Sequence, residues 1–229
     1  MRQIILDLET TGLDSAQGHR IIDFSGLEMI NRQLTGQNYQ VYINPERLIE
    51  EGAQSIHGLT NEFLADKPVF SAIASTIAEF ISGAELIIHN AVFDVGFLNT
   101  EFARLNMDPI EKICAGVIDT LHIAREMFPG KRNNLDALCD RFNIDLSNRT
   151  LHGALTDCNL LAQIYLLLTR GQEILAINMD PQSQMKPFAS ALTIDQSTLK
   201  IQLASEKECA SHENYLKQLG GNCMWHKYS

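Results

Sequence analysis

The sequence has few of the features that mark secreted, zinc-stabilised or membrane proteins. Its five cysteines are widely spaced and include no CxxC pair, which argues against a structural zinc site and favours free thiols in a reducing compartment. The first apolar run ends at once in Asp7 and Glu9, so it is not a signal peptide. The stretch from Leu160 to Leu168 is far too short to cross a bilayer. These absences predict a cytoplasmic protein with no membrane partner.

Positive charge is also scarce. The chain has 18 basic and 28 acidic residues, which gives a formal net charge of −10. A protein that binds nucleic acid by itself usually presents a basic face, because neutralised phosphates provide much of the affinity. If the chain acts on DNA, we therefore expect its own affinity to be weak and a partner to deliver the strand. Acidity that only maintains solubility explains the charge equally well.

The hydrophobic pattern predicts one α/β domain. Three short strands near the start, with a turn at residues 34–36, indicate an antiparallel meander, and the later alternation of strands and helices is typical of parallel strands with crossover helices. The predicted strands span residues 3–8, 20–30, 39–43, 85–89 and 113–118. The predicted helices span residues 70–81, 94–105, 121–127, 135–142 and 156–169. We expect a mixed five-stranded sheet with helices packed on it.

The composition changes after about Arg170. Residues 173–205 are polar, with many Gln and Ser, and indicate a flexible linker between the domain at 1–172 and a C-terminal segment at 206–229. That segment is expected to begin with a short helix, and Trp225 follows near its end. Tryptophan is enriched in binding hot spots, so we predict a docking segment, the alternative being that Trp225 packs on its own domain.

Two carboxylates lie at the end of the first predicted strand. Asp7 and Glu9 are two residues apart, so their side chains face the same side of the strand. Neighbouring carboxylates repel each other, and a divalent cation removes that conflict. Oxygen-only ligands favour Mg²⁺ or Mn²⁺ over zinc. Exposed acidic pairs are common, but the apolar strand before this pair and Gly12 in the turn after it favour a ligand site.

Two more polar groups follow later in the chain. In H-N-A-V-F-D, Asp94 is either a third acidic group of the same cleft or a partner of a helix N-terminus, and Phe93 either packs in the core or stacks on a base. In H-G-A-L-T-D, Asp157 lies in an apolar helix and, if it is buried, needs a partner such as a metal ion. His152 is suited to accept a proton near neutral pH, although a single histidine is more often an ordinary surface imidazole.

The three groups in this order resemble the motifs of the DEDDh exonucleases. Asp7 and Glu9 match the first motif, Asp94 the second, and His152 and Asp157 the third. The resemblance implies a ribonuclease H-like fold and 3′→5′ hydrolysis of a phosphodiester with two divalent cations. It further implies that Asp7 bridges both ions, that Glu9 and Asp157 hold the ion that binds the attacking water, that Asp94 helps to hold the second ion, and that His152 is the general base.

The same resemblance implies contacts with the substrate. His57, in I-H-G, stands at the position that lies against the terminal nucleotide in the family, and its neighbours would add backbone and stacking contacts. The predicted substrate-binding residues are Glu9, Thr10, Ile56, His57, Phe93 and Asp157.

More narrowly, the chain resembles the epsilon-type proofreading family of bacterial DNA polymerase III. The segments LDLETTGL, IHGLTNEFLADKP and RTLHGALTDC carry the likeness over residues 1–172, and it returns in the terminal G-G-x-C-x-W. It implies a DNA 3′ end as substrate and the polymerase catalytic (alpha) subunit as partner of the C-terminal segment, with a small theta-type subunit as a further partner. Gln172–Ile177 stands where the family binds the sliding clamp, although Ile177 replaces the usual aromatic residue. Asp23 and Phe24 replace a usual Glu and aliphatic residue, which we interpret as a packing variation.

Two other functions remain open from the residues alone. One is a stand-alone exoribonuclease that trims RNA 3′ ends, which the acidic charge and the Trp225 tail disfavour. The other is a non-catalytic scaffold that links polymerase and clamp, which the five intact motif positions disfavour.

Overall fold

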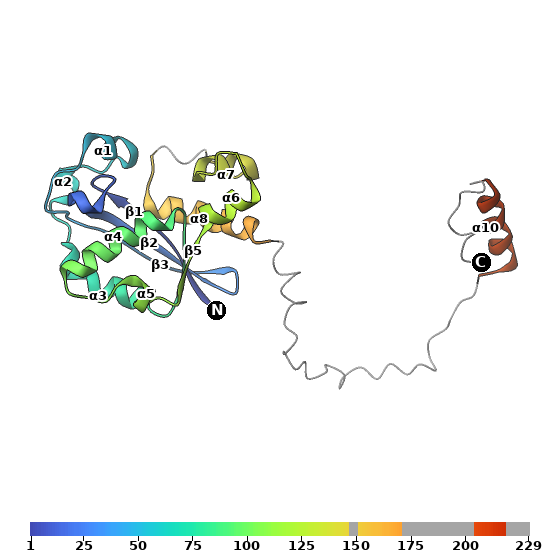
Figure 1. Cartoon of the computed structure of the whole chain (residues 1–229), viewed down its shortest axis with the longest axis horizontal. Coiled ribbons are helices and arrows are strands. Elements are labelled where there is room, and N and C mark those ends of the chain that lie inside the picture. The colour runs from blue at the N-terminus through green and yellow to red at the C-terminus, as the bar shows by residue number, and fades with distance from the viewer. Residues whose placement is uncertain (147–150, 171–203, 219–229) are drawn as a thin grey trace, which may run out of the picture. The chain divides into compact units, whose positions relative to one another are not determined.

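The computed structural model describes residues 1–146, 151–170 and 204–218 (Figure 1). The chain divides into two compact units, one ending at residue 179 and one beginning at residue 180. The predicted linker up to residue 203, the predicted clamp-binding segment and Trp225 lie outside the described residues. Within the described ranges, no helix combines the length and the apolar character that a bilayer crossing requires.

A mixed five-stranded sheet forms the centre of the first unit, in the order β3-β2-β1-β4-β5 (Figure 1). The pairs β1–β2 and β2–β3 are antiparallel, and the pairs β1–β4 and β4–β5 are parallel. The sheet confirms the predicted fold class. The strands are β1 (Arg2–Thr10), β2 (Ile21–Ile30), β3 (Gln33–Tyr42), β4 (Glu85–Ile88) and β5 (Gly116–Asp119).

The turn between β2 and β3 differs from the prediction. Residues 34–36 lie inside β3 and not in the turn, because Ile30 pairs with Gln33 and only Asn31 and Arg32 remain between the strands. Both turn residues have positive φ, 51° and 63°, which suits the twist of a two-residue hairpin. Asparagine adopts this conformation readily, but arginine is not a typical turn residue, so the local composition carries no clear sign of the turn.

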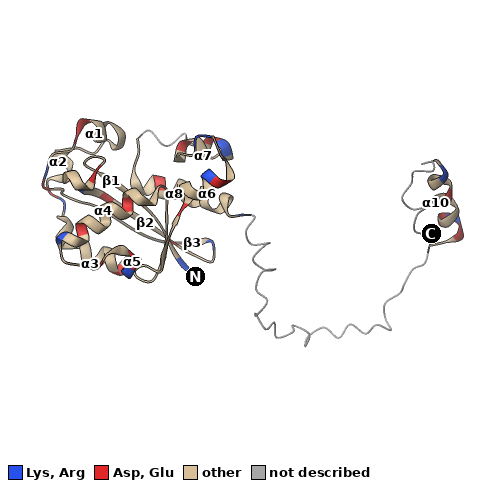
Figure 2. Cartoon of the chain, in the orientation of Figure 1, with Lys and Arg blue, Asp and Glu red and all other residues tan. Residues whose placement is uncertain are grey.

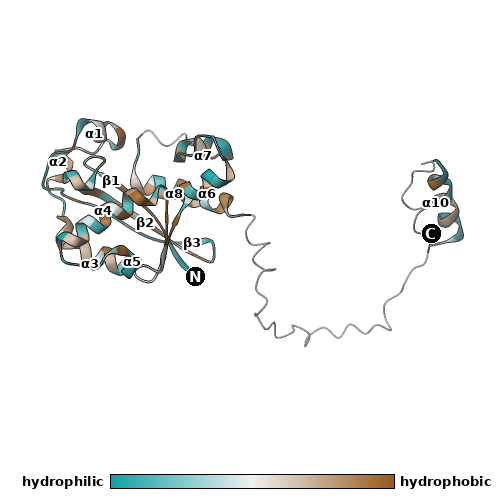
Figure 3. Ribbon diagram, in the orientation of Figure 1, coloured by the Kyte–Doolittle hydropathy of each residue, from teal (hydrophilic) through white to brown (hydrophobic). Residues whose placement is uncertain are grey.

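Helices cover both faces of the sheet, and hydrophobic residues concentrate on the central strands (Figure 3). Successive residues of β1 enter different cores, as the alternation of side chains along a strand requires. Leu6 and Leu8 pack with α3 (Phe70–Ile81) and α4 (Ala91–Arg104), whereas Ile5 packs with α8 (Ala154–Leu168). The sheet is therefore enclosed between α3 and α4 on one side and α8 on the other.

Smaller elements complete the first unit. Helices α6 (Thr120–Met127) and α7 (Leu135–Phe142) pack with α8 in a third cluster. The predicted strand at 113–118 is wrong in its first residues, because the short helix α5 (Ile110–Ile113) ends there and β5 begins at Gly116. Pro109 is the N-cap residue of that helix, with an extended backbone, and Ile110 is fully buried.

Besides α5, three other short elements in the described ranges were not predicted. They are η1 (Ser15–Gln17), α1 (Glu51–His57) and α2 (Asn61–Leu64). In α1 the only buried residue is His57, so the segment has no apolar stripe from which a helix could be recognised.

The described part of the second unit contains α10 (Glu206–Gln218), which matches the helix predicted there. Ser205 and Glu208 form a reciprocal cap, since the Glu208 carboxylate accepts from the Ser205 N–H at 2.8 Å and the Glu208 N–H donates to Ser205 Oγ at 3.4 Å. No residue of α10 is buried. The helix thus forms from local capping and propensity, without a packed face.

Candidate active site

Strand β1 extends beyond its parallel neighbour. The pairing of β1 with β4 stops at Ile5, whereas the pairing with β2 continues to Thr10. The last residues of β1 therefore have an open side at the carboxyl end of the parallel strands, the edge where α/β sheets bind ligands. Asp7 and Glu9 lie in this segment and are partly exposed.

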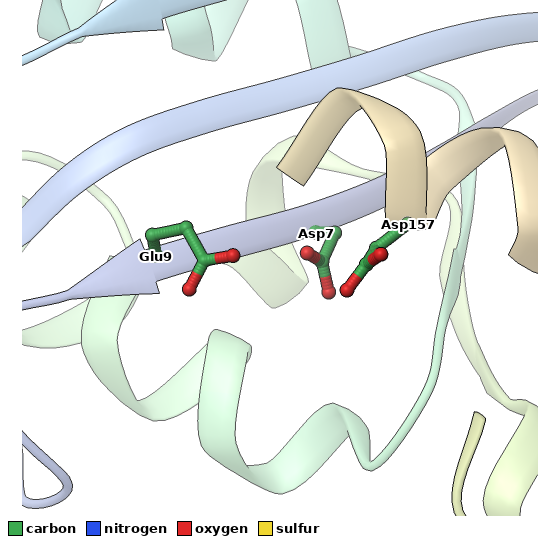
Figure 4. Close-up of side chains that lie close together, drawn as sticks. All are labelled: Asp7, Glu9 and Asp157. Carbon is green, nitrogen blue, oxygen red and sulfur yellow. The ribbon is translucent and has the colours of Figure 1, made fainter. Parts of the chain in front are cut away.

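Three carboxylates meet at this end of β1. Asp157 lies in the first turn of α8 and is buried, and one oxygen from each of Asp7, Glu9 and Asp157 lies within 4.8 Å of the others. Figure 4 shows the Asp7 and Asp157 carboxylates facing each other, with Glu9 farther along β1. We call these three residues the carboxylate cluster. Such an oxygen-only group suits a hard divalent cation.

Burial and the neighbouring negative charges make the ionised form of Asp7 costly without a cation. Burial raises the pKa of Asp7 well above its usual range, and the charges of Asp94, Glu9, Asp157 and Asp23 raise it further. Divalent positive charge would reverse this cost and hold Asp7 in its ionised form.

Asp94 approaches the cluster from the other face of the sheet. Helix α4 starts at Ala91, after Asn90 with φ 68°, so Asp94 lies in its first turn and does not open the helix as predicted. Its side chain is buried, and burial raises its pKa, while hydrogen bonds from its own backbone and from that of Leu8 act in the opposite direction. Asp94 is near enough to raise the pKa of Asp7 but lies outside the carboxylate cluster.

His152 stands beside the cluster, just before α8. Its Nδ1 lies 3.1 Å from Asp157 Oδ2, and its side chain is 43% exposed. Its backbone N–H donates to the carbonyl of Ile56 at 3.1 Å. An Nδ1–H that donates to Asp157 fixes the tautomer in which Nε2 carries the lone pair.

A cavity of about 340 Å³ opens next to Glu9. Its walls are the end of β1 with the turn that follows it, helix α1 and the start of α4. Every predicted substrate-binding residue except Asp157 lines it: Glu9, Thr10, Ile56, His57 and Phe93. Residues that the sequence reasoning missed also line it, among them Leu13, Glu50 and Ala53. Leu13 is 80% exposed. The signal available in the sequence was a large apolar residue directly after the turn that contains Gly12.

His57 is a buried wall of this cavity. Its Nδ1 accepts a hydrogen bond from the Leu59 N–H at 3.0 Å, and burial lowers its pKa. The ring is therefore neutral at physiological pH and carries its proton on Nε2.

His19, which sequence reasoning did not single out, ties two walls of the cavity together. Its ring is buried, with Nδ1 3.1 Å from Thr11 Oγ1 and Nε2 3.1 Å from Glu50 Oε1. A Cβ atom on Gly12 would overlap this ring. The glycine that we associated with approach to a ligand thus also makes room for His19.

Asp23 lies beside the cluster and is not a simple packing variation. It is the cross-strand partner of Glu9, is buried, and accepts hydrogen bonds from Gln40 Nε2 at 3.1 Å and Ser25 Oγ at 3.4 Å. Burial raises its pKa to about 7, against the lowering effect of these hydrogen bonds.

Replacing Asp23 by asparagine should stabilise the metal-free protein. Because the folded-state pKa is raised, the stability that the wild type has at low pH is lost as the pH rises from about 4 to about 7. An asparagine side chain stays neutral, so Asp23→Asn should raise the free energy of unfolding by about 2–4 kcal/mol at about pH 8, and this gain should vanish below about pH 4. Urea unfolding with a chelator across this pH range tests it. A gain that does not depend on pH would contradict the explanation.

Comparison with known proteins agrees with this geometry. The family described as Exonuclease (RNase_T) matches residues 4–165, so the chain belongs to the exonuclease family. DNA polymerase III subunit epsilon of Salmonella typhimurium is 46% identical over 98% of this chain and 97% of its own length. The corresponding Escherichia coli subunit is 44% identical over the same shares. Within the exonuclease family, the chain belongs to the DNA polymerase III epsilon subunits.

Solved structures share the fold. Exonuclease X in complex with 5′ overhanging duplex DNA has a TM-score of 0.57 and 24% identity, over 73% of this chain and 91% of that one. E. coli Exonuclease I in complex with a dA16 oligonucleotide has a TM-score of 0.67 and 21% identity, over 76% of this chain and 42% of that one.

Proposed function

We propose that the chain is the metal-dependent 3′→5′ proofreading exonuclease of a bacterial DNA polymerase III complex. The observation that carries the proposal is the carboxylate cluster, with His152 beside it and a cavity of about 340 Å³ next to Glu9. The near-full-length likeness to epsilon subunits supports DNA, and not RNA, as the substrate, and replication in the cytoplasm as the setting.

The carboxylate cluster, Asp94 and His152 would divide the chemistry among them. Two divalent cations, Mg²⁺ or Mn²⁺, would supply positive charge to the attacking and leaving oxygens. Asp7 would bind both, Glu9 and Asp157 the one beside the attacking water, and Asp94 would support the other. His152 would accept the proton of that water at Nε2. The products are a 5′-mononucleotide and a strand one residue shorter.

The cavity would receive the terminal nucleotide. Phe93 and Ile56 offer apolar surface to the base, and the neutral ring of His57 offers an uncharged wall. A mispaired end frays at lower cost than a paired one, so it reaches the cavity more often. This difference would give the enzyme its preference for mismatches.

The substrate is delivered by partners in this proposal. Lysine and arginine are scattered among acidic residues along the described elements (Figure 2), which supports a weak intrinsic affinity for DNA. The C-terminal segment, including the unpacked α10, would bind the polymerase alpha subunit. A theta-type subunit and, through Gln172–Ile177, the sliding clamp would be further partners.

The assay for this function uses the full chain and a single-stranded oligonucleotide labelled at its 5′ end. With Mn²⁺ or Mg²⁺ the chain should shorten the strand one nucleotide at a time and release 5′-mononucleotides. An oligonucleotide blocked at its 3′ end is the control and should remain intact. Failure to cut with either ion would refute the proposal, and a preference for RNA ends would favour the exoribonuclease.

Deleting residues 205–229 should separate the two activities of the chain. We expect cleavage of single-stranded DNA to stay within about 2-fold of the full chain, because the cluster and the cavity lie entirely in the first unit. Binding to the purified polymerase alpha subunit should be lost. Size-exclusion chromatography of the mixture measures this, and co-elution of the shortened chain would contradict the docking role.

A further inference from the structure

The residue before His152 is seated on the end of helix α1. A Cβ atom built on Gly58 would lie only 2.5 Å from Leu151 Cδ1, so the leucine occupies the space that the glycine leaves. Gly58 has φ +72° and ends α1. Leu151 is nevertheless 51% exposed, which is an unusual place for a leucine that serves only stability.

This seat belongs to the helix that lines the cavity. Ile56 and His57, the residues directly before Gly58, are cavity walls. Ile56 also accepts the backbone hydrogen bond of His152, at 3.1 Å. Two consecutive residues, Leu151 and His152, are therefore attached to the last turn of α1, one by packing and one by a hydrogen bond.

The place of the His152 ring depends on the backbone that carries it. Helix α8 begins two residues later, at Ala154, and its N-cap residue Gly153 provides no side-chain cap. Nδ1 of the ring lies 3.1 Å from Asp157 Oδ2. The ring keeps this place beside the cluster only if the backbone at residues 151 and 152 is held in position. A displacement of about 1 Å at such a group can cost about 100-fold in rate.

We propose that Leu151 is a positioning residue for the reaction: by packing on Gly58 it holds His152 against the carboxylate cluster and fixes it to the helix that receives the terminal nucleotide. This inference rests on the proposed function. Helix α1 then supports both the wall of the nucleotide cavity and the general base His152, and so fixes their positions relative to each other. Because Leu151 does not line the cavity, it acts through His152 and not through the substrate.

The first test is the change Leu151→Ala in the full chain, assayed on single-stranded DNA with Mn²⁺. We expect kcat to fall by about 10- to 100-fold, with KM and Mn²⁺ affinity within about 2-fold of the wild type. Leu34→Ala is the matched control, since Leu34 is 47% exposed on β3, and it should leave kcat unchanged. An unchanged kcat for Leu151→Ala, with an active wild type, would overturn the inference but not the proposed function.

A double-mutant cycle shows whether the effect passes through His152. In the His152→Ala background, Leu151→Ala should cause no further loss of single-turnover rate. An equal loss in both backgrounds would mean that Leu151 acts independently of the base, and the inference would be wrong. A wild-type chain that fails to cut DNA at all would instead defeat the proposed function.

The reciprocal change is Gly58→Ala, whose new Cβ would push Leu151 from its seat. It should lower kcat about as much as Leu151→Ala, and the two changes together should not be additive. Gly130→Ala controls for backbone strain, because Gly130 has the same φ of +72° with nothing within 4 Å of its would-be Cβ. If Gly130→Ala and Gly58→Ala reduced kcat equally, strain and not the loss of the seat would be the cause.

Discussion

Replacing His152 by alanine should lower kcat by about 10²- to 10⁴-fold while metal binding stays nearly unchanged. The ring lies 3.1 Å from Asp157 and is partly exposed, so its removal leaves the three carboxylates in place. Raising the pH should recover part of the cleavage rate of the variant, because hydroxide can then attack the phosphodiester without help from a base.

The measurement combines single-turnover cleavage with calorimetric titration of Mn²⁺. His122→Ala is a suitable control, since His122 is exposed on α6, where its Nε2 lies 3.4 Å from Glu126 Oε1. It should leave the rate unchanged. Turnover of the His152→Ala variant at the wild-type rate would remove His152 from the mechanism, whereas a loss of Mn²⁺ binding would make it a ligand and not a base.

Replacing Asp7 by asparagine should abolish measurable cleavage and yet stabilise the metal-free chain. Asp7 lies with Asp157 and Glu9 in the cluster (Figure 4). Loss of this shared ligand should weaken cation binding. It should also remove several kcal/mol of charge stabilisation, which lowers kcat by about 10³-fold or more. Without metal, the same carboxylate is held at a cost, because burial and the neighbouring negative charges raise its pKa. Asparagine keeps the shape and removes the charge.

The stability gain from Asp7→Asn should depend on both pH and metal. A raised folded-state pKa means that the wild type loses stability as the pH rises, so the gain should be present at about pH 8 and should fade in acid. Saturating Mn²⁺ should reverse the order, since only the wild type gains binding free energy on folding. Thermal unfolding of both proteins, with chelator and with Mn²⁺, measures this reversal in their order of stability. Asp108→Asn, at an exposed ion pair with Lys112, should change neither condition by more than a few tenths of a kcal/mol.

The sheet and most helices were predictable because their signals are local. Alternating or continuous apolar runs marked the strands, and helical spacing marked residues 70–81 and 135–142, which form α3 and α7 with those bounds. The errors fall where the signal is weak: the turn at Asn31 and Arg32, the late start of β5, and the short helix α1. Each depends on contacts with residues far along the chain.

The functional site was likewise predictable in part from the sequence. Strand periodicity alone predicted that Asp7 and Glu9 face the same side of the strand. The resemblance to the DEDDh motifs then indicated that Asp94, His152 and Asp157 belong to the same site. Nothing in the residues around position 23 indicated a buried acid with a pKa of about 7, and the overlap of Gly12 with His19 could not be read from their separation in sequence.

By itself, the sequence determined the family, the order of the strands and longer helices, and which carboxylates could serve together. Only the tertiary structure decided how close they come, which of them are buried, and that Leu151 rests on Gly58 beside the cavity. The physical reason is range. Secondary structure follows from propensity and periodicity over a few neighbouring residues, whereas distance, burial and pKa depend on which helix packs on which face of the sheet.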